Sequence, residues 1–148
     1  MISFTNTIHV NRPPEAVYAY MADLEHTPDW NWAITDTTKI TAGPVAVGTR
    51  YAQTRSVPRP GTEMLEITTL ENGRHIEVQG TLARFTARLN YHIEQEDEGA
   101  QLTNTVNLET QGALRLISPM LGSNIKRAVA DNLNELKARL ETRTARAT

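Results

Sequence analysis

The sequence predicts an α+β protein in which a curved antiparallel sheet of six to seven strands wraps around one long C-terminal helix. Three observations indicate this fold class. A strand-like segment opens the chain, about six alternating segments then follow one another with short turns, and an amphipathic helical pattern ends it. Successive strands joined by short turns pair as an antiparallel meander whose apolar face must be covered. Only the last helix has an apolar stripe long enough, so we expect it to lie along the concave face of the sheet and to leave a cavity there.

The first strand and two short helices are predicted at the start of the chain. Residues 2–10 alternate between apolar and polar side chains, which indicates a half-buried strand, and Asn6 falls on its apolar side. Asn11 is a candidate cap for a helix over residues 13–24, where apolar side chains recur at helical spacing. Residues 24–30 predict a turn and a second short helix.

The β patterns and the long helix occupy the rest of the chain. Alternation predicts strands over residues 34–41, 49–57, 62–71, 74–80, 82–95 and 101–110. The Asn72-Gly73 pair is a strong signal for a tight hairpin turn. The final helix is predicted over residues 113–141, with a kink near Pro119 and Gly122. Because neither a repeat nor a linker interrupts the chain, we expect residues 1–148 to form a single domain.

The composition argues against several classes of function. The chain has 148 residues, of which 39% are hydrophobic and 22% charged, as in ordinary folded domains. A net charge of −2 argues against a nucleic-acid partner. The absence of cysteine removes disulfides, thiol nucleophiles and thiolate metal sites. No signal peptide and no membrane-spanning run are visible, so we expect a cytoplasmic monomer or homodimer without integral membrane association.

The histidines do not predict a metal site. His9, His75 and His92 fall on the polar sides of predicted strands, and His26 lies on the second short helix, so solvent exposure explains all four. The sequence has no HExxH motif and no pair of histidines on an apolar face. It also lacks the glycine-rich motifs that bind nucleotides. We therefore expect no metal and no other cofactor.

Three passages resemble a known family. Residues 7–31, "TIHVNRPPEAVYAYMADLEHTPDWN", are similar to its first strand, its P-x-E-x-V-W/Y helix start and its D…PxW second helix. Residues 43–51, "GPVAVGTRY", resemble the turn before its third strand, and residues 136–141, "LKARLE", resemble the end of its gripping helix. The family is the START-like superfamily with the helix-grip fold, also called SRPBCC, and the chain looks most like small bacterial members of its polyketide cyclase/dehydrase-like branch. The resemblance implies the fold over nearly the whole chain but does not fix a function, since members include transporters, sensors and cyclases.

The two tryptophans lie in the polar stretch "DLEHTPDWNW". By resemblance, the two short helices close one end of the sheet, and Trp30 packs there as a plug. Trp32 has two interpretations. It is either half-exposed packing, or a wall of the cavity mouth that faces a ligand.

Polar residues on the inward side of predicted strands are the candidate site. Asn6 and Asn104 lie on the first and last strands, where they either bond to each other or the backbone, or orient a ligand. Tyr91 is inward by alternation, and its hydroxyl is the natural polar group of the cavity wall. Asp36 is either a buried acid–base group or an exposed carboxylate on an edge strand. These residues show no catalytic motif.

The third strand offers a further candidate group. Tyr51, Gln53 and Arg55 share one side, which faces either inward or solvent. If that side is inward, Arg55 is a buried cation that needs an anion, and Glu63 on the next strand or a ligand carboxylate would supply it.

Three functions remain open on this sequence. The first is binding of a hydrophobic or aromatic small molecule, such as a lipid, between the sheet and the last helix. We expect the ligand-binding residues to include Asn6, Trp32, Tyr51, Gln53, Phe85, Leu89, Tyr91, Asn104, Ile117 and Leu121, with Phe4, Tyr20, Leu65 and Val129 completing the wall. The second is a cyclase/dehydratase-like enzyme with Asp36, Arg55, Glu63 or Tyr91 as acid–base groups. The third is a protein-interaction module with a vestigial cavity.

Overall fold

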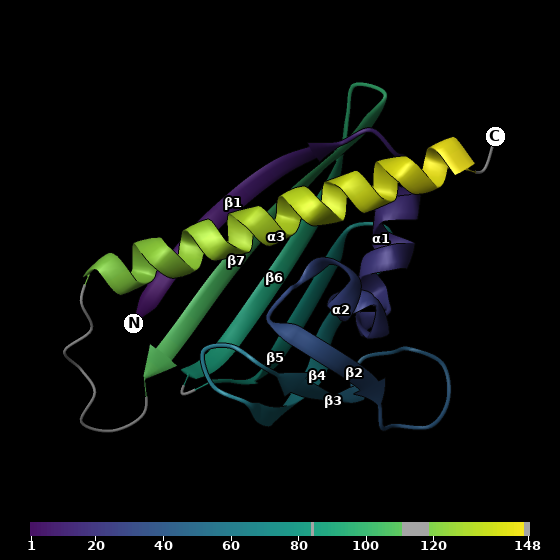
Figure 1. Cartoon of the computed structure of the whole chain (residues 1–148). Coiled ribbons are helices and arrows are strands. Elements are labelled where there is room, and N and C mark those ends of the chain that lie inside the picture. Colours follow the sequence, from purple (N-terminus) through teal and green to yellow (C-terminus); the bar gives the residue numbers. More distant parts are fainter. Residues whose placement is uncertain (84, 111–118, 147–148) are drawn as a thin grey trace.

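The structure is a computed structural model that describes residues 1–83, 85–110 and 119–146, with the side chains of Pro119 and residues 143–146 excepted. It contains a seven-stranded antiparallel sheet and a long C-terminal helix (Figure 1). The strands are β1 (Ile2–Val10), β2 (Ile34–Lys39), β3 (Arg50–Arg55), β4 (Gly61–Glu71), β5 (His75–Leu82), β6 (Phe85–Glu96) and β7 (Gly99–Thr110). Their order in the sheet is β1-β7-β6-β5-β4-β3-β2. The predicted fold class is therefore confirmed.

The sheet follows from a meander with one long-range pairing. Strands β2 to β7 pair with their neighbours along the chain, and β1 returns to pair with β7, so that Asn6 lies opposite Asn104. The pattern of alternating burial persists along β7, where every second residue from Ala100 to Leu108 is buried. This alternation gives the sheet one apolar face, which must be covered.

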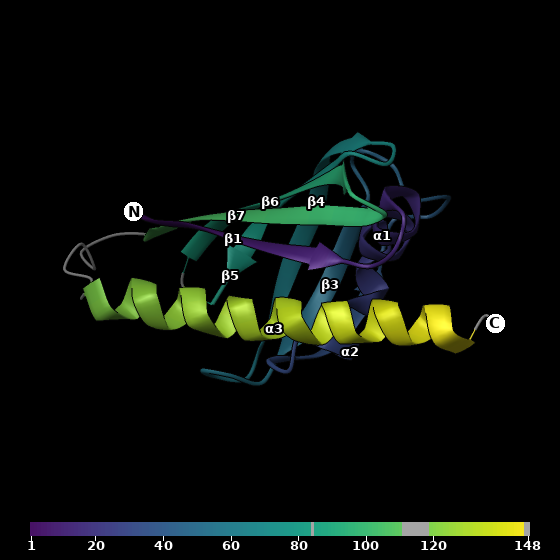
Figure 2. The ribbon, with the colours of Figure 1, turned by 90° about the horizontal axis from the view of Figure 1, so that it is seen from above.

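The C-terminal helix α3 (Pro119–Arg146) covers that face, and Figure 2 shows it extending along one side of the sheet. Its fully buried leucines are Leu133, Leu136 and Leu140, which step by three and four residues. They belong to the same core cluster as buried sheet residues that include Ile67, Ile76 and Leu102. Each such side chain stabilises the fold by about 1.5–3 kcal/mol. The predicted residues 113–118 of this helix lie outside the described residues.

Short helices close one end of the sheet between β1 and β2. They are α1 (Pro14–Ala22), the 3-10 helix η1 (Leu24–His26) and α2 (Thr27–Trp30). The prediction of Asn11 as the cap of α1 is wrong. Pro13 holds the cap position without a side-chain hydrogen bond, because proline already fixes the backbone angle that the helix start needs.

Most strand bounds differ from the prediction by a few residues, and two local differences change how the chain runs. A register shift between Ile34 and Asp36 reverses the facing of β2, so that Asp36 is exposed and the interpretation of it as an inward residue is wrong. The turn between β5 and β6 lies after Leu82 rather than at Gly80. Ala83 begins it with a positive φ of 55°.

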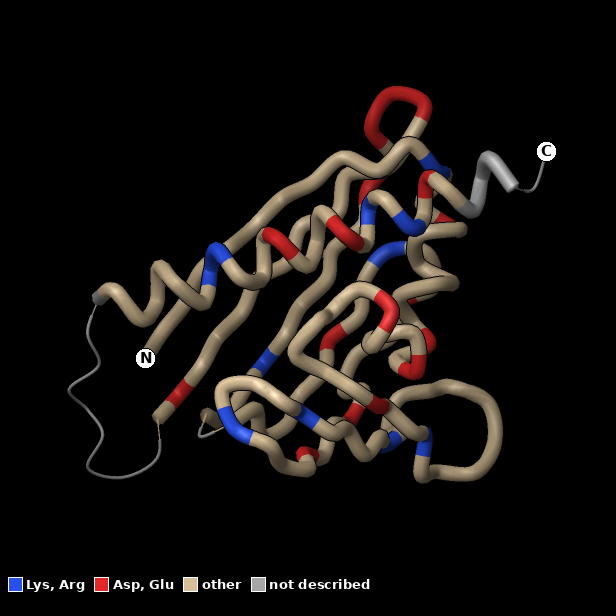
Figure 3. Tube along the Cα trace, viewed as in Figure 1, with Lys and Arg blue, Asp and Glu red and all other residues tan. Residues whose placement is uncertain are grey.

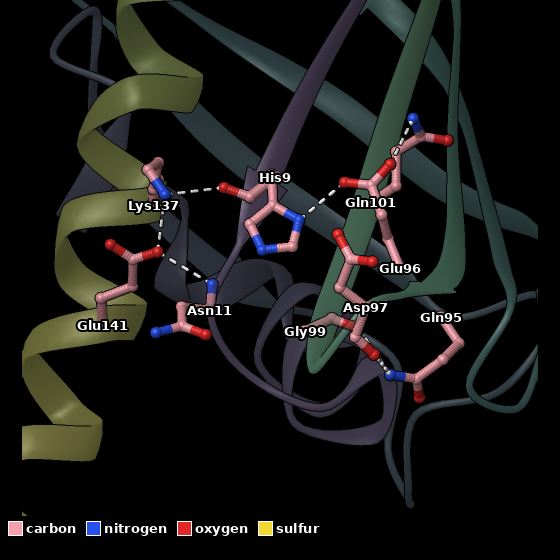
Figure 4. Close-up of polar contacts among 9 residues, drawn as sticks. All are labelled: His9, Asn11, Gln95, Glu96, Asp97, Gly99, Gln101, Lys137 and Glu141. Atoms are coloured by element: carbon pink, nitrogen blue, oxygen red, sulfur yellow. Dashed lines mark hydrogen bonds and ion pairs between the residues drawn. The ribbon is translucent and has the colours of Figure 1, made fainter.

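A group of polar contacts fastens the C-terminal half of α3 to the end of β1 (Figure 4). Lys137 Nζ donates hydrogen bonds to His9 O at 2.8 Å and to Glu141 Oε2 at 2.6 Å. The same Glu141 oxygen accepts from the Asn11 amide at 2.8 Å. On the other side, His9 Nδ1 lies 2.6 Å from Glu96 Oε1, beside the acidic β6–β7 turn that Figure 3 shows in red.

Candidate functional site

A cavity of about 370 Å³ lies between the sheet, α2 and α3. Its size falls in the range of small-molecule sites in proteins. Among the described residues, the wall is mainly apolar and is completed by four asparagines, Arg55 and Tyr91. It consists of Trp30, Asn31, Trp32, Ala33, Arg55, Val57, Pro58, Leu82, Ala83, Phe85, Leu89, Tyr91, Asn104, Val106, Leu108, Leu121, Asn124, Ile125, Ala128, Val129, Asn132 and Leu133. A smaller cavity of about 60 Å³ shares part of this wall, including Trp30, Arg55 and Tyr91.

Many of the predicted wall residues lie where the sequence placed them. Trp32, Phe85, Leu89, Tyr91, Asn104, Leu121 and Val129 all line the larger cavity. Gln53 and Leu65 line the smaller one instead. Ile117 lies outside the described residues.

Four predicted residues lie elsewhere. Tyr51 is fully buried in the core and lines neither of these cavities; burial, with the negative charge of nearby Asp23, raises the pKa of its hydroxyl to about 12. Tyr20 is also a core residue, and Phe4 packs beside a second, smaller core cluster. Asn6 donates its amide to the backbone oxygen of Lys126 on α3 at 3.2 Å, so it joins β1 to the helix rather than bonding to Asn104.

Arg55 and Glu63 form a buried ion pair at the edge of the cavity. Arg55 Nε donates to Glu63 Oε2 at 2.8 Å, and the two side chains are only 14% and 6% exposed. Gln53 Nε2 donates to the other carboxylate oxygen at 2.8 Å, and the Ala83 amide donates to Oε2 as well. The side of β3 that carries Gln53 and Arg55 therefore faces inward, and Glu63 supplies the anion that Arg55 needs.

Tyr91 and Asn104 form the polar part of the sheet wall. They lie opposite each other in the β6–β7 pairing, and both line the larger cavity. Asn104 donates its amide to the backbone oxygen of Asn90 at 3.1 Å. Burial raises the pKa of the Tyr91 hydroxyl well above its usual range, so this hydroxyl is neutral at physiological pH and can both donate and accept a hydrogen bond.

The two tryptophans have different environments. Trp30 is 8% exposed and belongs to the main core, as expected for a plug, although one side of it lines the cavity. Trp32 is 64% exposed and also lines the cavity. Exposed Val57 and Leu121 line it too, so these three side chains lie where the cavity meets solvent.

None of the four histidines lines either cavity. His26 stacks on Tyr20 with ring centroids 4.2 Å apart, and His75 stacks on His92 at 4.0 Å. Among the described residues, no group of three or more histidine, aspartate or glutamate side chains has a metal-binding arrangement. Within the same described part of the chain, no helix is long and apolar enough to cross a bilayer.

Sequence reasoning found Leu121 and Val129 but missed other cavity residues of α3, including Asn124, Ala128 and Asn132. Asn132 is 8% exposed and lines the cavity, and Ala128 and Asn124 line it one and two turns earlier, respectively. A signal for Asn132 was present, because it follows Val129 by three residues and precedes Leu136 by four, on the apolar stripe. A polar residue on such a stripe marks either a buried hydrogen bond or a cavity.

Comparisons with known proteins agree with this architecture. The family described as "Polyketide cyclase / dehydrase and lipid transport" matches residues 1–141. No curated protein matches the sequence. A START superfamily protein from Mycobacterium smegmatis is 14% identical, with a TM-score of 0.80 over 95% of this chain and 97% of that chain. The Zhui aromatase/cyclase from Streptomyces sp. R1128 is 17% identical, with a TM-score of 0.78 over 96% and 94%. Ara h 8.0201 is 14% identical, with a TM-score of 0.75 over 95% and 97%. At these identities the structures show a common fold.

Proposed function

The chain belongs to the polyketide cyclase/dehydrase and lipid transport family, as its three characteristic passages predicted, and on this premise we propose that it binds a hydrophobic or aromatic small molecule in the cavity between the sheet and α3. The observation that carries the proposal is the cavity itself, which has a volume of about 370 Å³ and a mainly apolar wall. Apolar burial drives such binding, and a few polar groups orient the ligand.

A thermal-shift screen of the purified protein against fatty acids, sterols, flavonoids and aromatic polyketides tests this proposal. A ligand of the native state raises the melting temperature in a concentration-dependent way. Quenching of Trp30 and Trp32 fluorescence checks each hit, because both side chains line the cavity. A panel without any saturable shift would count against cavity binding.

A cavity-filling variant makes the test specific to this site. Ala128 on α3 lines the cavity, and Ala138 is exposed farther along the same helix. We expect Ala128→Phe to abolish the ligand-dependent shift, because the new ring occupies the space that the ligand needs. Ala138→Phe is the matched control and is expected to bind as the wild type does. Equal binding by both variants would place the ligand elsewhere.

A cyclase/dehydratase-like enzyme is the second candidate. The observation that favours it is that Arg55, Glu63 and Tyr91 come close to one cavity, where Arg55 and Tyr91 line the wall and Glu63 is bonded to Arg55. A polyketide substrate held there in one conformation would react faster, since orientation alone removes much of the barrier. Any screening hit is incubated with the protein and its products are analysed. Turnover that Tyr91→Phe abolishes, with binding retained, would favour the enzyme over the binding protein.

A further inference from the structure

Polar residues in the wall of the larger cavity differ in whether their side chains are hydrogen-bonded within the protein. Arg55 is the only charged side chain among the described residues of its wall, and it is already paired with Glu63 at 2.8 Å. Glu63 in turn accepts from Gln53 and from the Ala83 amide. The charges at this end of the cavity therefore cancel.

Tyr91 and Asn132 are buried polar residues of the wall whose side chains are not paired in this way. Tyr91 reaches the cavity from the sheet and Asn132 from α3, and they are only 9% and 8% exposed. Within the described part of the chain, no hydrogen bond is formed by the Tyr91 hydroxyl or by the Asn132 side-chain amide. Both remain available to whatever fills the cavity.

Such groups place a condition on the ligand. Buried polar groups in folded proteins are almost always hydrogen-bonded, to protein or to ordered water. A purely apolar ligand would displace that water and leave the hydroxyl and the amide unpaired, which weakens binding. A ligand with its own donor or acceptor keeps both groups paired.

We infer that the ligand of this cavity is an uncharged, largely apolar molecule with a hydroxyl or carbonyl group that hydrogen-bonds to Tyr91 and Asn132. This inference rests on the proposed binding function and adds the chemical class of the ligand. The hydroxyl of Tyr91 is a donor or an acceptor, and the amide of Asn132 offers both, so either ligand group fits.

A carboxylate ligand fits the cavity poorly. Its natural partner is Arg55, but the Glu63 carboxylate lies 2.8 Å from the Arg55 Nε and would repel a second anion. If Arg55 turned to the ligand instead, Glu63 would keep a buried negative charge without its cation, which is costly. The cavity wall therefore selects against fatty acids and other carboxylates.

Three probe compounds with one ring system separate these ligand classes. They are 2-naphthol, naphthalene and 2-naphthoate, and their dissociation constants are measured by equilibrium dialysis at pH 7. We expect 2-naphthol to bind about fivefold more tightly than naphthalene, which corresponds to about one net hydrogen bond. The carboxylate 2-naphthoate is expected to bind most weakly.

Two variants test the residues. Tyr91→Phe and Asn132→Leu remove the polar groups with little change of volume, and we expect each to reduce the preference for 2-naphthol over naphthalene while naphthalene binds at least as tightly as to the wild type. The matched controls are Tyr18→Phe on α1, which lines neither cavity, and Asn134→Leu on the exposed side of α3. Both controls should keep the wild-type preference.

A third variant tests the charge argument. Glu63→Gln leaves Arg55 without its anion, so it should increase the affinity for 2-naphthoate and leave that for naphthalene unchanged. Equal affinities of the wild type for all three compounds, or tightest binding of 2-naphthoate, would overturn the inference but not the proposed function. Binding of none of them would count against both.

Discussion

Arg55 Nε lies 2.8 Å from Glu63 Oε2, across neighbouring strands and largely out of solvent. A second arginine–glutamate pair joins the same two strands, since Arg50 Nε lies 3.0 Å from Glu66 Oε1. The second pair is much more exposed than the first. The two pairs share chemistry and strands but differ in burial, so they form a natural comparison.

The buried pair should matter far more for stability than the exposed one. We expect Glu63→Gln to reduce the free energy of unfolding by about 3 kcal/mol, because it leaves a mostly buried cation unpaired. Glu66→Gln is the control and should cost less than about 1 kcal/mol. Urea unfolding followed by circular dichroism measures both. Equal losses would show that burial does not govern the strength of these pairs.

Replacing both members of the buried pair should restore stability. In the double variant Arg55→Met/Glu63→Leu no charge is left unpaired, so we expect it to be more stable than Glu63→Gln by about 1 kcal/mol or more. The same urea titration provides the measurement. A double variant as unstable as the single one would mean that the pair is held by more than its charges, for example by the Gln53 and Ala83 bonds to Glu63.

The two tryptophans should differ in how much they contribute to stability. Trp30→Ala is expected to reduce the free energy of unfolding by about 3 kcal/mol or more, since it empties a core position. Trp32→Ala should change it by less than about 0.5 kcal/mol, because the side chain is mostly exposed. Urea unfolding followed by circular dichroism avoids relying on the fluorescence that the variants remove. A large loss for Trp32→Ala would mean that Trp32 is a packing residue.

Gly80 occupies a place that no larger residue fits. It lies opposite Leu65 in the β4–β5 pairing, and a Cβ there would collide with the Met64 backbone oxygen. We expect Gly80→Ala to cost about 1–3 kcal/mol of unfolding free energy, because backbone atoms must move. Gly61→Ala is the control, since a Cβ at Gly61 meets nothing within 4 Å. Thermal unfolding distinguishes them, and equal melting temperatures would contradict the collision.

The fold followed from the sequence because periodicity and turn residues encode it locally. Alternation located the strands, and helical spacing located α3. The predictions are wrong where the strand departs locally from a regular alternating pattern. A register shift after Ile34 turned Asp36 outward, and Gly80 marked a close backbone approach inside β5 rather than its end.

The candidate site was less predictable than the fold. Alternation correctly turned Tyr91 and Asn104 inward, but it could not say that Tyr51 would be covered completely by the core. The Arg55–Glu63 pair was foreseen only as one alternative, since its geometry depends on the register of β3 and β4. The position of Asn132 on the apolar stripe of α3 was a signal in the sequence, but only the distance between α3 and the sheet decides whether such a residue lines a cavity or makes a buried hydrogen bond.

The contacts that fasten α3 to β1 predict how stability changes with pH. Burial alone would raise the pKa of Glu141, but hydrogen bonds from Lys137 and the Asn11 amide outweigh it and hold the pKa below its usual value. Since the native state binds this proton less tightly than the unfolded chain, the stabilisation is present above pH of about 4.3 and is lost as the pH falls through the lower native pKa.

The Glu141→Gln variant isolates this effect. It should be less stable than the wild type at pH 7, and the difference should shrink as the pH falls below about 4, because the wild-type carboxyl then becomes neutral too. Urea unfolding at pH 7, 5, 4 and 3 measures the difference. Glu135→Gln, from the more exposed Glu135–Arg139 pair on the same helix, is the control and should change stability by less than about 0.5 kcal/mol throughout. A Glu141→Gln deficit that stays constant down to pH 3 would show that the carboxylate charge does not fasten α3 to β1.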